Sequence, residues 1–378
     1  MEKQAEERAR IVMEALKQRE KRYKLEEEVK ILEEQASIEY EKKKKEEERK
    51  KKEELKRRDE ERKYEEERIK KMQDEERRLK EHAERKKLEE KKIADELAMK
   101  KEEEKKLTLQ ARVPGAIVSQ EIISKRSFRE PEIDGNPEPS IWQNIQPYLI
   151  VTKNKSEREK LIIIKSIYAN DYIFFYLQWE DNTENVTHKT WIWNKDKKQY
   201  EIGGDHEDKV ALMFGLGNSF DACMLRGIIY EADVWEWGAA RTNPAGFADD
   251  QKIIVSSERI RRANSYRAKN GRNIWIKFIF DQGEPCYRED VVVDYKWDKV
   301  PRYSSCFPTE SRADIKAKGI WKEGIWQVEF KRKLNTKDKD NDIVFNTRKE
   351  YLFGVAIFDH DKQINHYTSD NLILKFVQ

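Results

Sequence analysis

Residues 160–183 read KLIIIKSIYANDYIFFYLQWEDNT, two runs of β-branched and aromatic side chains that end in Asn and Asp residues. Such runs favour β-strands, and Asn and Asp favour the turns between them. Further short runs of the same kind follow along the chain: KTWIWNKD, KVALMFGLG, NIWIKFIFD, GIWQVEFKRKL, EYLFGVAIFD and NLILKFV. Because no helical pattern of about 10–15 residues separates them, this part of the chain predicts a β-sandwich or barrel.

Composition divides the chain in two. Charged residues make up 40% of the whole, yet the stretch before Pro114 contains neither glycine nor proline and is dominated by Lys, Arg and Glu. All nine prolines, all ten tryptophans and all three cysteines lie from Pro114 onward, so only the second part can bury a large core. We expect three segments: a charged α-helical rod over 1–113, an irregular proline-containing linker over 114–138, and a β-sandwich over 139–378.

The charge balance indicates which partners the protein can bind, and the cysteines indicate its redox compartment. The 78 basic and 75 acidic residues leave a net charge of +3, and their interspersed signs argue against nucleic acid as a partner. Cys223, Cys286 and Cys306 are far apart and form no metal or disulfide pattern, which suits a reducing compartment. The start, MEKQAEERARIVMEALK, lacks an apolar signal region, and no run approaches the roughly 18 apolar residues of a membrane span. We expect an intracellular protein without a membrane partner.

Residues 41–63, EKKKKEEERKKKEELKRRDEERK, contain one uncharged side chain, Leu55. Acidic residues stand four positions before basic ones, as in Glu41/Lys45, and each such pair stabilises a helix by roughly 0.2–0.5 kcal/mol. This spacing predicts a solvated helix, and a disordered charged tail is the alternative. A continuous helix of about 110 residues would be on the order of 165 Å long, at ~1.5 Å per residue.

Apolar residues recur on both sides of this charged segment. One set has heptad spacing, namely Leu25, Val29, Leu32 and Ala36. A weaker set follows, namely Ile69, Met72, Leu79, Leu88, Ile93 and Leu97. These sets predict two short coiled-coil or docking segments, and the pattern leaves open whether the rod is a single helix or pairs with another.

The most distinctive motif is EADVWEWGAARTNPAGFADDQ, residues 231–251. Its alternation predicts a strand that directs Trp235 and Trp237 to one face, followed by a loop that contains a proline and a glycine. In the simplest interpretation both tryptophans fill the sandwich core. Arg241 and Asp249 then pair to fix the loop.

The same motif is part of a longer resemblance. In chain order the matching segments are IYANDYIFFYLQWEDNT (167–183), EDKVALMF (207–214), the motif itself, RADIKAKGIWKEGIWQVEFKRKL (312–334) and YLFGVAIFDHD (351–361). Through them, the chain from about Pro139 to its end resembles the haem-binding domain of the ethylbenzene dehydrogenase gamma-subunit and cytochrome c-552-like (DMSO reductase-like) family. The resemblance implies a β-sandwich that holds a haem at one end, and members usually serve as electron-transfer subunits outside the cytoplasm.

The resemblance also implies a set of cofactor-binding residues. Trp235 and Trp237 would supply flat apolar neighbours for a macrocycle, and Arg241 would bind a propionate. Relatives with non-covalent haem use a Met on one side of the iron and a Lys or His on the other. Met224 and His366 are the candidates here, although a Met among apolar residues is often core and His366 could equally be a surface histidine.

Covalent haem is not expected. Relatives with covalent haem carry a Cys…Cys-His stretch just before the Trp-x-Trp motif. The corresponding stretch here, SFDACMLRGIIYEAD, contains Cys223 without a second Cys or a His. The chain therefore departs from the covalent pattern of the family it resembles.

Other chemistries lack their motifs. GLGNS at 215–219 has no P-loop lysine, and the sequence contains no HExxH, no GxSxG and no Cys/His cluster with zinc spacing. Asp249-Asp250 could bind a hard cation, but one carboxylate pair alone is a weak signal. We expect neither a catalytic constellation nor a metal site.

Two functions remain open from the sequence. We expect a non-enzymatic assembly component without a cofactor, in which the rod tethers the haem-binding-like sandwich to protein partners in a large filament or assembly. It would be cytoplasmic and cytoskeletal, with the cilium and its axoneme as one candidate. The alternative is a b-type haem protein, with haem b bound non-covalently, that acts in electron transfer or haem sensing.

Overall fold

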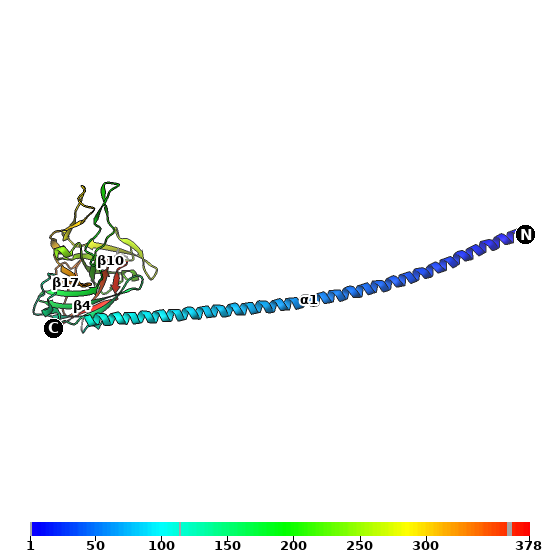
Figure 1. Ribbon diagram of the computed structural model, residues 1–378, viewed down its shortest axis with the longest axis horizontal. Helices are drawn as coiled ribbons and strands as arrows, with labels where there is room; N and C mark the ends of the chain where they lie inside the picture. Colours follow the sequence, from blue (N-terminus) through cyan, green and yellow to red (C-terminus); the bar gives the residue numbers. More distant parts are fainter. Residues whose placement is uncertain (1, 113–114, 361–364) are drawn as a thin grey trace. The chain divides into compact units, whose positions relative to one another are not determined.

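The computed structural model describes residues 2–112, 115–360 and 365–378. The chain forms two compact units that divide between Lys100 and Lys101. The predicted domain boundary at Val113-Pro114 lies outside the described residues. Within each unit the ribbon in Figure 1 shows one kind of structure, helix in the first and mainly strands in the second.

A single helix, α1, runs from Glu2 to Arg112. Its 111 residues contain no breaker and correspond to a length on the order of 165 Å. Exposed i,i+4 ion pairs accompany the charged segment, with Lys50 Nζ 3.0 Å from Glu46 Oε1 and Arg58 Nη2 3.0 Å from Glu54 Oε1. The long helix expected from the sequence is therefore confirmed.

The apolar side chains of the rod are exposed. Leu25 exposes 61% of its surface, and the second set, Ile69, Met72, Leu79, Leu88, Ile93 and Leu97, exposes between 47% and 65%. The side chains of Val29, Leu32 and Ala36 lie outside the described residues. Pairing of the rod in a coiled coil stays a prediction.

The second unit is built from strands. They are β1 (Ile117–Val118), β2 (Glu121–Arg126), β3 (Tyr148–Lys153), β4 (Glu159–Ala169), β5 (Tyr172–Glu180), β6 (Trp191–Asn194), β7 (Gln199–Ile202), β8 (Lys209–Gly215), β9 (Tyr230–Gly238), β10 (Asp249–Ser256), β11 (Asn264–Arg267), β12 (Asn273–Phe280), β13 (Tyr287–Glu289), β14 (Lys299–Val300), β15 (Tyr303–Ser305), β16 (Lys316–Lys322), β17 (Ile325–Lys333), β18 (Tyr351–Phe358), β19 (Tyr367–Ser369) and β20 (Leu372–Val377). The helical pieces are short: α2 (Pro139–Trp142) and the 3₁₀ turns η1 (Met224–Arg226), η2 (Asn243–Ala245) and η3 (Glu310–Ala313).

Fifteen strands form one sheet that folds back on itself into two layers. One layer follows the order β11-β12-β10-β9-β8-β18, and the other contains β2-β4-β5-β17-β16. Strands β20, β19 and β3 connect them, since β20 pairs with both β18 and β2, and β19 pairs with both β18 and β3. The predicted β-sandwich preceded by a long helix is thus confirmed.

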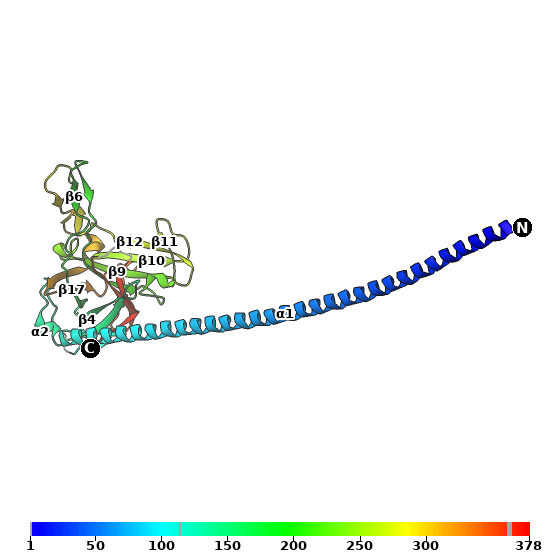
Figure 2. The same ribbon diagram turned by 45° about the vertical axis from the view of Figure 1, so that its right-hand side comes forward.

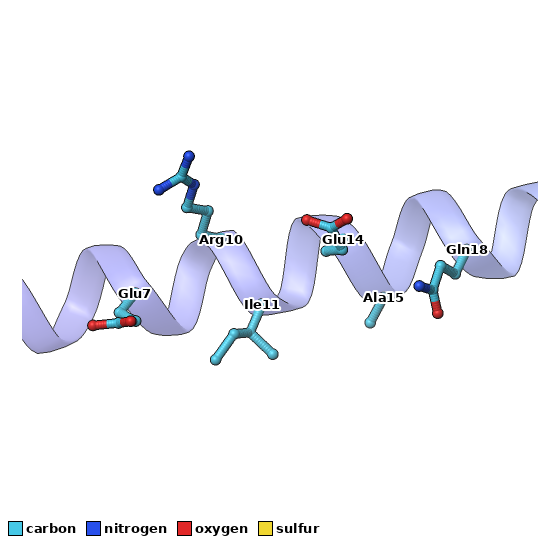
Figure 3. Close-up of a pocket in the computed structure, with 6 residues that line it drawn as sticks. All are labelled: Glu7, Arg10, Ile11, Glu14, Ala15 and Gln18. Atoms are coloured by element: carbon cyan, nitrogen blue, oxygen red, sulfur yellow. The ribbon is translucent and has the colours of Figure 1, made fainter.

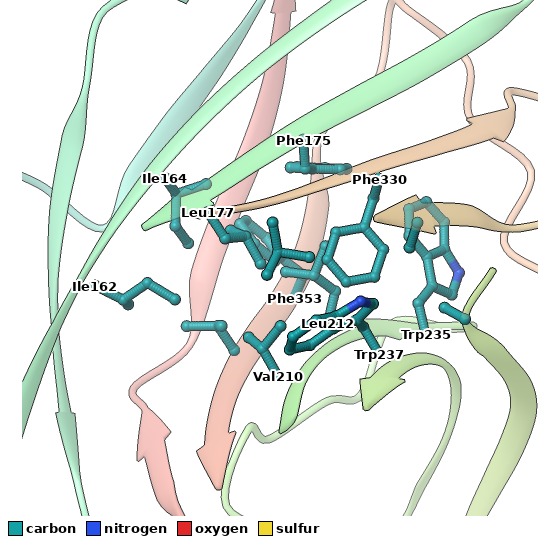
Figure 4. Close-up of a cluster of buried hydrophobic side chains, with 14 of the residues drawn as sticks. Ile162, Ile164, Phe175, Leu177, Val210, Leu212, Trp235, Trp237, Phe330 and Phe353 are labelled. Atoms are coloured by element: carbon teal, nitrogen blue, oxygen red, sulfur yellow. The ribbon is translucent and has the colours of Figure 1, made fainter. Parts of the chain in front are cut away.

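The main core lies between these layers. Figure 4 shows Ile164 and Leu177 of β4 and β5 facing Leu212 and Trp237 of β8 and β9, and these side chains are fully buried. The alternation of apolar residues along each strand places every second side chain in this core. A second apolar cluster, around Met213 and Ile253, covers the other face of β8, β9 and β10.

The segment expected to be an irregular linker contributes to the sheet. Strand β2, inside 114–138, pairs in parallel with β20 and with β4, and β1 pairs with β3. Pro131 and Pro137 fall outside these strands, which leaves the ladder hydrogen bonds free to form. The division of the chain into the three predicted segments stays a prediction.

A small sheet with the order β14-β6-β7 projects from the sandwich (Figure 2). Among the described residues, no helix combines the length and the apolar composition needed to cross a membrane.

Candidate functional site

Strand β9 carries the Trp-x-Trp motif and presents different residues to its two faces. Trp235 and Trp237 are fully buried in the core between the layers, whereas Val234 and Glu236 line the opposite face. Trp237 Nε1 donates a hydrogen bond to Asn243 Oδ1 at 3.1 Å, which ties the strand to the following loop. The packing agrees with the interpretation that both tryptophans fill the sandwich core.

Arg241 fixes the loop after β9. Its Nε and its backbone N–H both donate to the carboxylate of Glu207, which also accepts the N–H of Ala240 at 2.7 Å. Nη2 of Arg241 lies 3.3 Å from Glu236 Oε1. The guanidinium and the backbone of the loop therefore share one buried carboxylate.

Asp249 extends this network from the next strand. It accepts a hydrogen bond from Tyr287 Oη at 2.9 Å, and it pairs with Arg312. Arg241 Nη1 lies 3.2 Å from Tyr287 Oη and 3.9 Å from Asp249 Oδ2. The expected pairing of Arg241 with Asp249 is present at the long end of ion-pair distances, and Glu207 is the closer partner.

Neighbouring opposite charges favour the ionised forms of Arg241 and Glu236 despite their burial. Burial opposes the charge on Arg241, but Glu207 and Glu236 raise the pKa of its guanidinium well above the ordinary value. Burial likewise opposes ionisation of Glu236, whereas Lys209, 3.0 Å away, and Arg241 bring its pKa below the ordinary value. Arg241 is thus occupied by protein carboxylates, which would compete with a propionate.

Met224 and His366 both lie on the other side of β9. Both line a pocket of about 50 Å³, together with Met213 and Glu236. The His366 ring stacks on Phe358 with 4.7 Å between the ring centroids. The structure therefore brings the two candidate axial ligands to one pocket.

The five candidate haem residues do not line a common cavity. Trp235 and Trp237 face the core, Met224 and His366 line the pocket behind that sheet, and Arg241 belongs to the loop network. Pockets for small molecules usually enclose about 300–1,000 Å³, several times the volume found here. The described residues as arranged do not fit a haem.

A hollow also occurs on the surface of α1 (Figure 3). It is lined by Glu7, Arg10, Ile11, Glu14, Ala15 and Gln18, which are neighbours along one helix at three- and four-residue steps. A site walled by a single helix face leaves a ligand open to solvent. We therefore do not treat it as a binding pocket.

A second group of interest is a buried cluster of acidic side chains. It consists of Asp233 of β9, Asp250 of β10, Asp342 from the loop between β17 and β18, and Arg332 of β17. All four side chains are at most 2% exposed. Arg332 pairs with Asp233 and lies 3.1 Å from Asp342.

This cluster was not predicted from the sequence. Asp249 and Asp250 are adjacent in the sequence, but neighbouring residues of a strand point to opposite faces. Asp249 joins the Arg241 network, and Asp250 points to the core side, where it stands opposite Trp235 in the β9–β10 register. The available signal was Asp-x-Asp-x-Asp at 338–342, a spacing found in cation-binding loops.

Comparison with known families assigns the second unit. Residues 139–369 match the family described as ethylbenzene dehydrogenase, and the chain therefore belongs to this family. The match covers strands β3 to β19, which include the Trp-x-Trp motif, and it also contains the buried acidic cluster. No curated protein matches the chain.

Solved structures with a similar chain path include a family 9 carbohydrate-binding module from Caldicellulosiruptor kristjanssonii. Its complex with cellotriose shows 12% identity and a TM-score of 0.31, and the match covers 68% of this chain and 93% of that one. Its complex with glucose shows 10% identity and a TM-score of 0.30, over 68% of this chain and 95% of that one.

Proposed function

We propose that this chain is a non-enzymatic assembly component, in which the rod tethers the sandwich to protein partners in a larger structure. The observation that carries the proposal is the exposed apolar seam on α1. The rod is continuous over 111 residues, which suits contacts spread along a filament array such as the cytoskeleton or the ciliary axoneme.

The seam has the spacing of a helix-binding surface. Ile69, Met72, Leu79, Ile93 and Leu97 fall at the a and d positions of one heptad register, whereas Leu88 falls outside it. All of them are exposed in the single chain. Burial of apolar surface contributes about 25 cal/mol per Å², so this seam gains stability when another helix covers it.

The charged residues around the seam would give the contact its selectivity. Exposed ion pairs contribute about 0–1 kcal/mol each, and they are weakened by salt. They keep the helix formed without a partner and leave its apolar seam free. Docking through the rod then leaves both faces of the sandwich available to further partners.

The structural role of the Trp-x-Trp motif in the sandwich supports the same function. Trp235 and Trp237 fill the core, and Arg241 holds the loop through Glu207. Each retained motif residue has a structural use that does not require haem. The alternative of a b-type haem protein is favoured by one observation, namely that Met224 and His366 line the same pocket.

The experiment compares two variants in the native cell. Leu79→Gln with Ile93→Gln removes two seam residues and keeps good helix formers in place. The matched control, Leu88→Gln with Met99→Gln, removes two exposed apolar side chains that fall outside this heptad register. We expect the control to fractionate with its assembly like the unchanged chain, and the seam variant to move to the unassembled fraction.

Circular dichroism of both variants verifies that the helix is retained. Equal distribution of the seam variant and the control would contradict docking through the seam. If the unsubstituted chain were itself found only in the unassembled fraction, this result would contradict the assembly function.

A further inference from the structure

The buried acidic cluster contains more acceptor oxygens than its neighbours satisfy. Asp233 Oδ2 accepts from Arg332 and from the N–H of Ile343 at 2.9 Å, and Asp342 Oδ2 accepts from Thr336. Asp233 Oδ1, Asp342 Oδ1 and both oxygens of Asp250 have no hydrogen-bond partner among the described residues. Four buried carboxylate oxygens are thus left for another group.

The charges in the cluster do not balance. Three carboxylates face one guanidinium, so the ionised cluster carries a net charge of −2 in the protein interior. Lys252, which follows on the same face of β10, is engaged elsewhere, since its Nζ lies 2.6 Å from Glu231 and donates to the carbonyl of Asp340 at 2.7 Å. Buried charge of this size requires either bound protons or a bound cation.

We propose that Asp233, Asp250 and Asp342 bind one hard divalent cation, with calcium as the best fit. Asp250 supplies two oxygens, and Asp233 and Asp342 supply one each, while Arg332 keeps its present partners. The ion restores neutrality to the cluster. It also links the loop that carries Asp342 to strands β9 and β10.

The donor set favours calcium over other metals. It contains only carboxylate oxygens, which suit hard cations and not zinc. One oxygen from each of the three aspartates lies within 4.8 Å of the others, close enough for a single ion to bridge all three side chains. A fully buried site suits calcium better than magnesium, because magnesium loses its bound water reluctantly and usually keeps several water ligands.

Burial makes the ionised cluster unfavourable when no cation is bound. Burial, with Asp233 nearby, raises the pKa of Asp250 well above its ordinary value, and burial raises that of Asp233 to about 6. A bound divalent ion would favour the ionised carboxylates, because metal ligands bind in their ionised form.

Terbium luminescence provides a direct test with the full chain. Tb³⁺ occupies calcium sites and emits when a nearby tryptophan is excited, and Trp235 lies opposite Asp250 in the strand register. The charged rod contains no tryptophan, so ions bound at scattered carboxylates along it contribute little emission. We expect saturable emission at one ion per chain, which Ca²⁺ displaces more readily than Mg²⁺.

Two variants locate the site. Asp250→Asn removes the charge at nearly constant shape and should abolish the saturable emission, whereas Asp340→Asn, an exposed residue of the same loop, should keep it. Calcium at ~100 times its Kd should raise the Tm of the unchanged chain by about 5–10 °C, and chelator should reverse this rise.

The outcomes separate the cation from a bound proton. Equal emission from both variants would overturn the proposal in favour of scattered surface binding. A Tm that neither calcium, magnesium nor chelator changes would overturn it in favour of protons, and Asp250→Asn would then unfold at the same temperature as the unchanged chain. The direct titration remains decisive even if Asp250→Asn folds poorly.

Discussion

Trp237 of β9 meets Trp326 of β17 across the two layers of the sandwich, with 5.1 Å between ring centroids and an angle of 70° between the rings. This edge-to-face arrangement is favoured because the positive edge of one ring lies against the negative face of the other. The contact joins the family motif to the opposite layer. It makes the motif part of the packing that holds the layers together.

Replacing Trp237 with alanine should lower the free energy of unfolding of the sandwich by about 3–5 kcal/mol, because it leaves a cavity between the layers. Urea unfolding followed by far-UV circular dichroism measures the change. Trp297, which is 73% exposed, provides the control, and its replacement by alanine should change stability by less than about 0.5 kcal/mol. Equal effects of the two substitutions would mean that Trp237 is not a core residue.

Replacing Arg241 with alanine should destabilise the sandwich by about 3–5 kcal/mol, because it leaves the buried carboxylate of Glu207 without its cation. Arg241→Lys should recover only part of this loss, since an ammonium cannot reproduce the fork that contacts Glu207 and Glu236. The exposed Arg288 serves as the control for charge removal. A stable Arg241→Ala variant would show that the loop does not depend on this network.

Glu329 should make stability depend on pH. Burial raises its pKa from 4.5 to about 7, and its Oε1 accepts from Trp142 Nε1 at 2.6 Å. Between pH 4.5 and about 7 the folded state holds this proton, whereas the unfolded state has lost it. The contribution of Glu329 to stability is therefore complete below pH 4.5 and is lost as the pH rises through about 7.

Glu329→Gln removes this dependence and keeps an acceptor for Trp142. The variant should be more stable than the unchanged chain at pH 8, by about 3 kcal/mol, and the advantage should vanish near pH 4. Urea unfolding at both pH values measures it. Glu184→Gln, at an exposed position, is the control, and a parallel response of the two variants would contradict the account.

An isolated fragment of residues 1–110 should give a helical far-UV spectrum at low salt. Its helix content should fall as salt is added, because the ion pairs that support it are exposed and salt screens them. The measurement is a salt titration by circular dichroism. A random-coil spectrum at low salt would contradict a self-supporting rod.

The features that the sequence predicts well are local ones. Pairs such as Glu46/Lys50 are four residues apart, so the helix follows from the sequence alone. The strand around Trp235 follows from alternation, and the β-sandwich follows from a series of such runs. The strand β2 was harder to predict, because its partners β20 and β4 lie far away along the chain.

Sites that depend on distant residues could not be predicted. Arg241 contacts Glu207, 34 residues away, and Asp342 lies close to Asp233 at a separation of more than a hundred residues. The periodicity of a sequence carries no information about contacts between residues that are far apart along the chain. The faces of β9 were predictable, but the sequence does not reveal that Met224 and His366 lie behind the sheet that carries Trp235.

An absorption spectrum of the protein purified from its native source tests the central claim most directly. An assembly component built on this sandwich should show no Soret band, because Arg241 is held by protein carboxylates and the pocket beside Met224 measures about 50 Å³. A Soret band of near-stoichiometric intensity, lost on replacing Met224 or His366, would contradict the account and identify a haem carrier.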